Sequence, residues 1–136
     1  MITPTGTAAP VLRADAFVRG EERRTLDLSD YRGTWVVVAF GVRRTDVFEF
    51  AELEEAFAAD GAVVVAATPD DWHEVEHRFG PETAVRFPIL SGVDERRRIT
   101  AIVDPGGVVR HVGLRRSARE ILSVLEAQLT PLQSAA

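Results

Sequence analysis

The sequence predicts an α/β fold built from alternating strands and helices. Two segments are continuously apolar, as is typical of central strands that are covered on both faces. The stretch between them carries large apolar side chains at helical spacing, and a later Pro-Gly turn separates two further apolar segments. These features are the strands Trp35–Phe40 and Ala62–Ala67, the helical stretch 46–59, and the turn Asp104–Gly107.

The N-terminal half predicts a hairpin followed by a β-α-β unit. Residues 11–18 and 22–27 are expected to pair around Arg19-Gly20-Glu21. The helix of the β-α-β unit is expected to begin near Thr45 or Asp46 and to extend to about residue 59, because an apolar stripe follows at the spacing i, i+3, i+7. That stripe consists of Phe50, Leu53 and Phe57.

The C-terminal half predicts a second helix, a short strand, a hairpin and a closing helix. The second helix starts at Pro69-Asp70-Asp71, and a short strand covers Arg86–Leu90. The closing helix begins at Ser117, whose spacing to Glu120 fits a capping box. The inward side chains of the second helix are Trp72, Val75 and Phe79, the hairpin strands are Ile99–Val103 and Val108–Val112, and the apolar face of the closing helix is Ile121, Leu122, Leu125 and Leu129.

Composition restricts both the class of protein and its chemistry. With 136 residues, of which 46% are hydrophobic, the chain is expected to form a single soluble domain over residues 1–136. A net charge of −5 is unfavourable for general binding to nucleic acid or to a membrane surface. Cysteine and lysine are both absent, which excludes disulfides, thiolate metal sites and lysine Schiff bases.

The same composition indicates where the protein acts. The sixteen basic residues are all arginine, a bias that points to a GC-rich and therefore bacterial genome. The first ten residues show no signal-peptide pattern, and no apolar run has the length of a membrane span. The cytoplasm is the expected location.

Five segments, taken in order, resemble one known family. They are LSDYRG (28–33), TWVVVAFGVRRTDVFEFAEL (34–53), DGAVVVAATPD (60–70), FPIL (87–90) and ITAIVDPGGVVRHVG (99–113). This order resembles the peroxiredoxin and alkyl hydroperoxide reductase family over residues 8–128. The resemblance implies a thioredoxin-like fold, with a central mixed sheet flanked by helices and an N-terminal hairpin.

The chain departs from that family at the catalytic position. The family pattern P-x-x-x-T/S-x-x-C, aligned without gaps, places Val42 at the proline, Asp46 at the threonine and Glu49 at the cysteine. Arg98 stands where the family has an arginine just before the strand that leads to its Asp-Pro turn. A carboxylate has no sulfur redox chemistry, so thiol peroxidase activity is excluded. The segment Ser91–Arg98 is also shorter than in the family, which is expected to widen the pocket above Glu49 or to remove it.

Glu49 admits a structural and a functional interpretation. In the first, Asp46 is the N-cap of the helix and Glu49 is its capping-box partner, which stabilises the helix by on the order of 1 kcal/mol. In the second, Glu49 and Arg98 form a catalytic pair in the inherited pocket, without metal or cofactor. Arg43, Arg44, Asp46 and Phe48 are then candidate binding residues for a small anionic or oxygen-rich ligand.

Two further patterns are interpreted as structural. His73-Glu74-Val75-Glu76-His77 matches the zinc-protease motif H-E-x-x-H, but both histidines are expected on the flank or solvent face of an amphipathic helix, and a metal site is not expected. His111 is expected on a hairpin strand, at the surface or edge. The arginine runs 96–98 and 115–116 have acidic neighbours, and they predict a solvated or ion-paired face.

Three functions are compatible with this sequence. The preferred one is a protein without thiol peroxidase activity that acts by association, as a homodimer or as the partner of another protein. The second is a cysteine-independent enzyme that uses Glu49 and Arg98. The third is a small-molecule binder that uses the same pocket without turnover.

Overall fold

The described chain forms one mixed sheet with its α-helices on one face. The computed structural model describes residues 5–18, 23–79 and 85–134, with side chains up to residue 129. Its strands are β1 (Arg13–Phe17), β2 (Arg24–Asp27), β3 (Trp35–Ala39), β4 (Ala62–Ala67), β5 (Ile89–Leu90), β6 (Ile99–Val103) and β7 (Val109–Leu114). Its helices are the 3-10 turn η1 (Leu28–Tyr31), α1 (Arg44–Glu52), α2 (Glu54–Ala59), α3 (Trp72–Arg78) and α4 (Ala118–Ser134).

The sheet confirms the predicted combination of a β-α-β unit with antiparallel hairpins. In the described part of the chain the strand order is β2-β1-β5-β4-β3-β6-β7. Strand β4 runs parallel to β3 and β5, while the pairs β1–β2, β1–β5, β3–β6 and β6–β7 are antiparallel. This is the thioredoxin-like arrangement that the resemblance implied. The turn predicted at residues 19–21 of the N-terminal hairpin lies outside the described residues.

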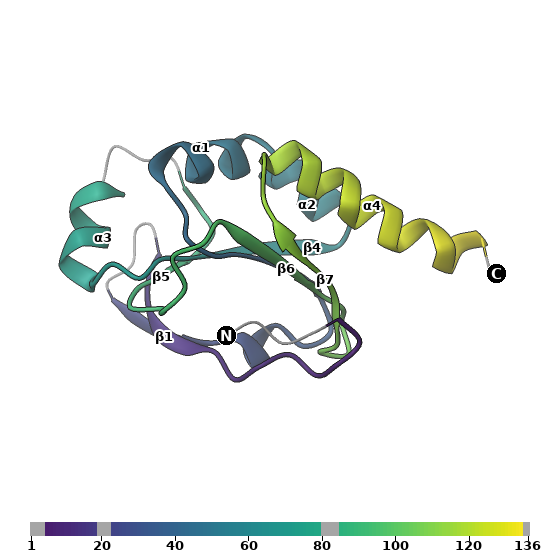
Figure 1. Cartoon of the computed structure of the whole chain (residues 1–136), viewed down its shortest axis with the longest axis horizontal. Coiled ribbons are helices and arrows are strands. Elements are labelled where there is room, and N and C mark those ends of the chain that lie inside the picture. Colours follow the sequence, from purple (N-terminus) through teal and green to yellow (C-terminus); the bar gives the residue numbers. More distant parts are fainter. Residues whose placement is uncertain (1–4, 19–22, 80–84, 135–136) are drawn as a thin grey trace.

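The two faces of the sheet are covered differently. Helices α1, α2 and α4 lie over one face (Figure 1), and the N-terminal residues Ala9 and Leu12, which precede β1, pack into the apolar cluster on the other face. Under the helices, Phe50, Phe57, Ile121 and Leu125 form the centre of a fully buried apolar cluster. The apolar runs of β3 and β4 are thus explained, because alternate side chains enter cores on both faces.

The single helix predicted over 46–59 is wrong in two respects. The helix begins earlier, at Arg44, and it is broken at Leu53, which has φ −102° and ψ 4°. The break leaves both predicted core aromatics in place, because Phe50 and Phe57 are fully buried with ring centroids 5.8 Å apart. Packing of these rings against the sheet therefore outweighs the continuity of the helix.

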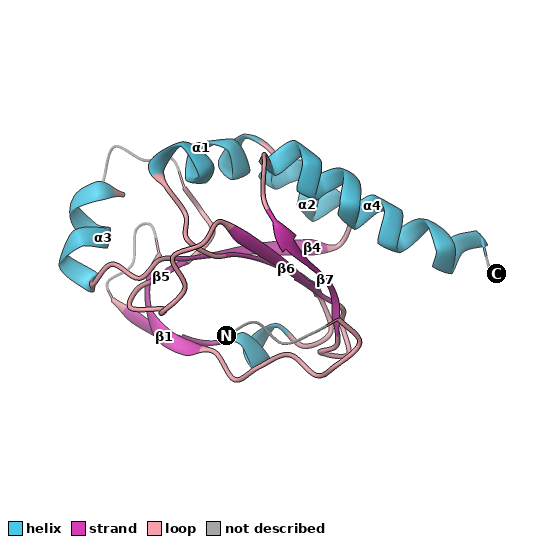
Figure 2. Ribbon diagram, in the orientation of Figure 1, coloured by secondary structure: helices cyan, strands magenta, loops and turns pink. Residues whose placement is uncertain are grey.

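Other boundaries differ from the prediction by a few residues. The strand predicted at Arg86–Leu90 is reduced to the two residues of β5, and β7 extends two residues beyond Val112. Helix α4 begins at Ala118 after the predicted cap, since the Glu120 N–H donates to Ser117 Oγ at 3.1 Å. Its C-terminal part runs past the end of the sheet (Figure 2). Within the described residues, no helix is both long and apolar enough to cross a bilayer.

Candidate functional site

Three loops meet at the end of β3 where α1 begins. Gly41 has φ +59°, a conformation that favours glycine, and a Cβ there would lie 2.6 Å from the Arg96 carbonyl oxygen. The Arg115 N–H donates to the Arg98 carbonyl at 2.7 Å, which joins the segment after β7 to the segment before β6. The sequence around position 49 is thereby brought into contact with two arginine-rich segments that are distant in the chain.

A buried carboxylate, that of Asp46, occupies the centre of this corner. The side chain of Asp46 is 1% exposed and forms ion pairs with both Arg98 and Arg115. Arg98 donates from Nε at 3.2 Å and also from its Nη2, and Arg115 donates at 3.3 Å. The Arg43 backbone N–H adds a bond of 2.9 Å, so four N–H groups converge on the two oxygens.

Arg115 is the most deeply buried member of the corner. Its side chain is fully buried, and its guanidinium also donates to the carbonyl oxygens of Ile99 and Phe40, both at 3.0 Å. The ring of Phe50 lies below it, 5.9 Å away. Arg115 is therefore ion-paired as the sequence predicted, but the expectation that it lies on a solvated face is wrong, because the turn after β7 directs it under α1.

The charged groups of this corner are stabilised by one another and by hydrogen bonds rather than by solvent. Burial raises the pKa of the Asp46 carboxyl, but the hydrogen bonds from Arg98 and the Arg43 N–H, together with the charge of Arg115, outweigh it and hold that pKa below its usual value. Burial lowers the pKa of Arg115, and the negative charge of Asp46 opposes that change. An arginine stays protonated under such conditions, so the corner holds one anion between two cations.

Glu49 lies beside this corner and bonds to a different helix. It is exposed, in the second turn of α1, and its Oε1 accepts the Ala118 N–H at 3.2 Å, at the start of α4. The predicted capping box of Asp46 with Glu49 is wrong: the N-cap is Arg43, and Asp46 is the third residue of the helix. The carboxylate of Glu49 is thus stabilised by the N-terminus of α4, whose dipole is positive there.

Glu49 and Arg98, which the sequence suggested as a catalytic pair, are each hydrogen-bonded to a different residue. The Arg98 guanidinium is bonded to Asp46, and the Glu49 carboxylate is bonded to Ala118. Both side chains keep some exposure, at 29% for Arg98. A catalytic role for this pair remains a prediction.

The remaining candidate binding residues, Arg43, Arg44 and Phe48, lie at the surface. Arg43 contributes its backbone N–H to the corner, while its side chain is exposed. The Arg44 guanidinium stacks over the Phe48 ring at 5.6 Å, and Phe48 is 39% exposed. Phe48 therefore presents an apolar ring to solvent, whereas its neighbour Phe50 fills the core.

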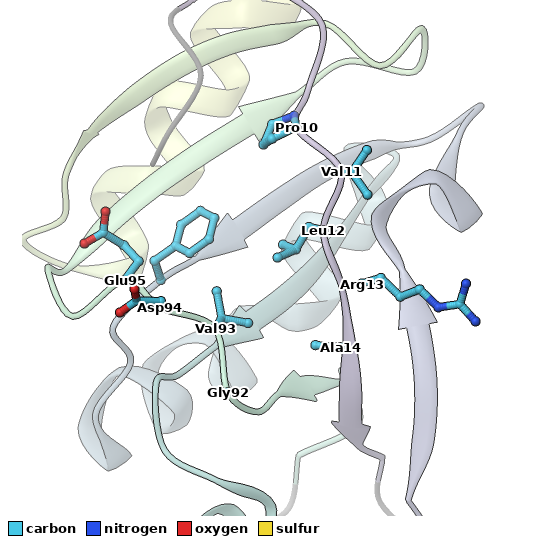
Figure 3. Close-up of a pocket in the computed structure, with 10 residues that line it drawn as sticks. Pro10, Val11, Leu12, Arg13, Ala14, Gly92, Val93, Asp94 and Glu95 are labelled. Atoms are coloured by element: carbon cyan, nitrogen blue, oxygen red, sulfur yellow. The ribbon is translucent and has the colours of Figure 1, made fainter.

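One cavity lies on the other face of the sheet. It has a volume of about 270 Å³ and is lined by Pro10–Ala14, Phe40 and Gly92–Glu95. Figure 3 shows Leu12 and Val93 directed into it, the carboxylates of Asp94 and Glu95 at one side, and Arg13 directed away. A second cavity of about 220 Å³ lies beside β4, near Tyr31 and Glu54. Neither of these two cavities is lined by Glu49 or Arg98.

The histidines of the H-E-x-x-H motif are placed as expected. His73 and His77 are exposed on α3, while Val75 and Phe79 are fully buried on its opposite side. Among the residues that the structure describes, no three His, Asp or Glu side chains are grouped so as to hold a metal ion. His111 lies on the edge strand β7, half-buried.

Comparison with protein families identifies this scaffold. The model of the AhpC/TSA family matches residues 5–112. The chain belongs to the AhpC/TSA family. Membership of the family confirms the resemblance seen in the sequence, and this member contains no cysteine.

Individual relatives of the family agree with this assignment. The chain is 28% identical to a thioredoxin peroxidase of Fasciola hepatica, over 76% of this chain and 67% of the relative. It is 26% identical to the peroxiredoxin Bcp of Bacillus subtilis, over 83% of this chain and 71% of the relative. Against peroxiredoxin TSA1 of Saccharomyces cerevisiae the identity is 25%, over 93% and 81% of the two chains.

Solved structures share the fold at lower sequence identity. The mitochondrial 2-Cys peroxiredoxin of Plasmodium falciparum superimposes with a TM-score of 0.84 at 18% identity, covering 98% of each chain. AhpC of Enterococcus faecalis gives a TM-score of 0.84 at 18% identity, covering 97% of this chain and 96% of its own. The thioredoxin-like architecture of the family is therefore retained almost throughout.

The sequence predicted neither the burial of Arg115 nor the central position of Asp46. The run 115–116 predicted a solvated or ion-paired face, and Asp46 was expected either at the helix cap or among the ligand-binding residues. One signal was available: Arg115 directly follows an apolar strand and precedes the cap of α4, in a turn that has to pass the start of α1. Sequence alone gives no measure of burial for such a residue.

Proposed function

We propose that this protein is a member of the AhpC/TSA family without thiol peroxidase activity, and that it acts by association. The observation that carries the first part is the ion-paired carboxylate of Asp46. Arg98 and Arg115 already hold an anion within the chain, and the chain has no thiol for them to activate. The corner has the electrostatics of an occupied anion site, and it has no group that exchanges electrons with a peroxide.

The open edge of β7 supports the second part. Within the described residues, β7 pairs with β6 on one side, and on the other side residues 6–9 bond to Gly107 and Val109. The Ile99 carbonyl accepts the Phe40 N–H, so Leu114, which lies opposite Ile99, directs its own N–H and C=O outward. The edge from Arg110 to Leu114 is therefore available to another strand.

A second copy of the chain fits this edge. Two β7 strands related by a twofold axis pair antiparallel, with the same residues on both sides. Twofold symmetry is the commonest symmetry of homo-oligomers. Leu114, 73% exposed, then gains an apolar contact on the partner. A heteromeric partner offering one strand uses the same backbone groups.

The absence of peroxidase activity is directly testable. Purified protein is expected to consume no hydrogen peroxide above buffer with a thiol donor, measured by peroxide-dependent oxidation of the donor. The variant Glu49→Cys is expected to react no faster than a free thiol of the same pKa, since Arg98 stays bonded to Asp46. Rapid turnover by the natural protein contradicts the proposal, and rapid reaction of Glu49→Cys shows that Arg98 is free to leave Asp46.

The dimer is tested by blocking the edge of β7. Leu114→Lys places like charges close together across the twofold axis and removes the apolar contact, so the variant is expected to be monomeric when the natural protein is dimeric. The measurement is mass by light scattering after gel filtration. Val11→Lys is the matched control, because Val11 is 90% exposed but lies outside β7. A natural protein that is monomeric at high concentration contradicts the homodimer, as does an unaltered dimer in Leu114→Lys.

A further inference from the structure

The positive charges of this acidic protein are concentrated at one end of the sheet. Eight of the sixteen arginines fall in the segments 41–46, 92–98 and 114–120, which meet around Asp46. Five carboxylates lie with them when Glu49 is included, so this region carries +3. The rest of the chain has eight arginines against sixteen carboxylates, a charge of −8.

The inner arginines of this region are ion-paired, and the outer ones are not. Arg98 and Arg115 bond to Asp46, and Arg97 bonds to Glu95 at 2.9 Å. The others are exposed, and in the described structure they form no ion pair. These outer arginines are Arg43, Arg44, Arg96, Arg116 and Arg119.

Exposed apolar side chains lie among these charges. Of the three large apolar residues that the described structure leaves exposed, two belong here, Phe48 on α1 and Leu114 at the end of β7. The Arg44 guanidinium already covers one face of Phe48. Arginine together with aromatic side chains, and without lysine, is the composition that protein interfaces favour.

We propose that this basic end, formed by the outer arginines with Phe48 and Leu114, binds an acidic segment of a partner polypeptide. The inference rests on the proposed role in association and specifies the chemistry of a heteromeric partner. Carboxylates of such a segment pair with the exposed guanidiniums, and its apolar residues cover Phe48 and Leu114. Charge complementarity of this kind accelerates association and selects the partner.

A polypeptide fits this surface better than a nucleic acid. Phosphate backbones are bound mainly by dense positive charge, and the charge of −8 over the rest of this protein repels a long polyanion. A short acidic segment with apolar residues meets only the basic end. It also covers the exposed apolar side chains, which phosphates do not.

The test uses a short fluorescein-labelled peptide of glutamate and aspartate with interspersed leucine and phenylalanine. Its binding to the full chain is followed by fluorescence anisotropy, and it is expected to weaken as salt is raised. The double variant Arg96→Glu/Arg116→Glu is expected to bind at least about tenfold more weakly. Arg13→Glu/Arg86→Glu is the matched control, because it reverses two exposed arginines outside the basic end and is expected to bind like the natural protein.

The following results of the binding test overturn the proposal. A specific site for an acidic segment is excluded if the acidic peptide does not bind. It is also excluded if a peptide with lysine in place of glutamate and aspartate binds equally well, or if the two double variants lose equal affinity for the acidic peptide. Tighter binding of single-stranded DNA of the same length indicates a nucleic-acid surface instead. A monomeric protein that binds the peptide removes only the homodimer, whereas a dimer that fails to bind it removes only this inference.

Discussion

Replacing Asp46 with alanine is expected to lower the free energy of unfolding by about 3–5 kcal/mol, the usual cost of breaking a buried ion pair from one side. The carboxylate accepts hydrogen bonds from two guanidiniums and one backbone N–H. The Arg115 side chain is fully buried, so solvent does not replace the carboxylate once Asp46 is mutated. An uncompensated charge then remains in the core. Urea unfolding followed by circular dichroism measures the loss.

The matched control for this variant is Asp70→Ala. Asp70 also pairs with an arginine, Arg78, but both side chains are about one-third exposed. Solvent screens such a pair, so the control is expected to lose no more than about 1 kcal/mol. Equal losses in the two variants contradict a special role for the corner.

The dependence of this loss on pH follows from the lowered pKa of Asp46. Because the folded-state pKa lies below that of the unfolded chain, the carboxylate contributes stability that is fully present above the unfolded value, near ~4. The contribution is lost as the pH falls through the lower, folded-state pKa. The difference between the natural protein and Asp46→Ala is therefore expected to shrink below about pH 4 and to stay constant near neutrality.

Replacing Arg115 with methionine is expected to have a comparably large effect, about 3–5 kcal/mol. Methionine preserves much of the volume but removes the donors to the Phe40 and Ile99 carbonyls, which stay buried without that partner. It also leaves Asp46 with one guanidinium. Arg98→Met is the control expected to cost less, because Arg98 is 29% exposed and water replaces part of what it contributes.

The double variant Asp46→Ala/Arg115→Met separates pairing from packing. If the two residues form one unit, the second replacement removes the charge that the first left unpaired, and the combined loss falls below the sum by about 0.5–3 kcal/mol. Additive losses in urea unfolding show instead that the two side chains act independently. In that case, the corner is not an occupied anion site.

The described fold was largely predictable because its apolar patterns are strong and local. Trp35–Phe40 and Ala62–Ala67 read as buried strands, and the turn at Asp104–Gly107 fixed a hairpin. Boundaries were less predictable where packing competes with local preference, as at Leu53, where the helix breaks while Phe50 and Phe57 stay in the core. The fold family came from the order of these segments rather than from any single one.

The candidate site was predictable in its residue types and less so in its pairings. Glu49 and Asp46 both lie on α1, and Arg98 contacts this helix from the segment before β6, yet Arg98 bonds to Asp46 and Glu49 bonds to the start of α4. Spacing along the chain placed Glu49 three residues after Asp46, which suggested a cap. The helix begins at Arg44 instead, and Asp46 turns inward.

The sequence by itself determined the chemistry that this protein lacks, because a chain without cysteine has no thiol in any conformation. It also determined the α/β order, since hydrophobic periodicity acts over neighbouring residues. Only the tertiary structure decided which charges meet: Asp46 bonds to partners 52 and 69 residues away. Such contacts depend on how three loops converge. Burial then removes the Asp46 carboxylate from solvent, so that its charge is stabilised by Arg98 and Arg115.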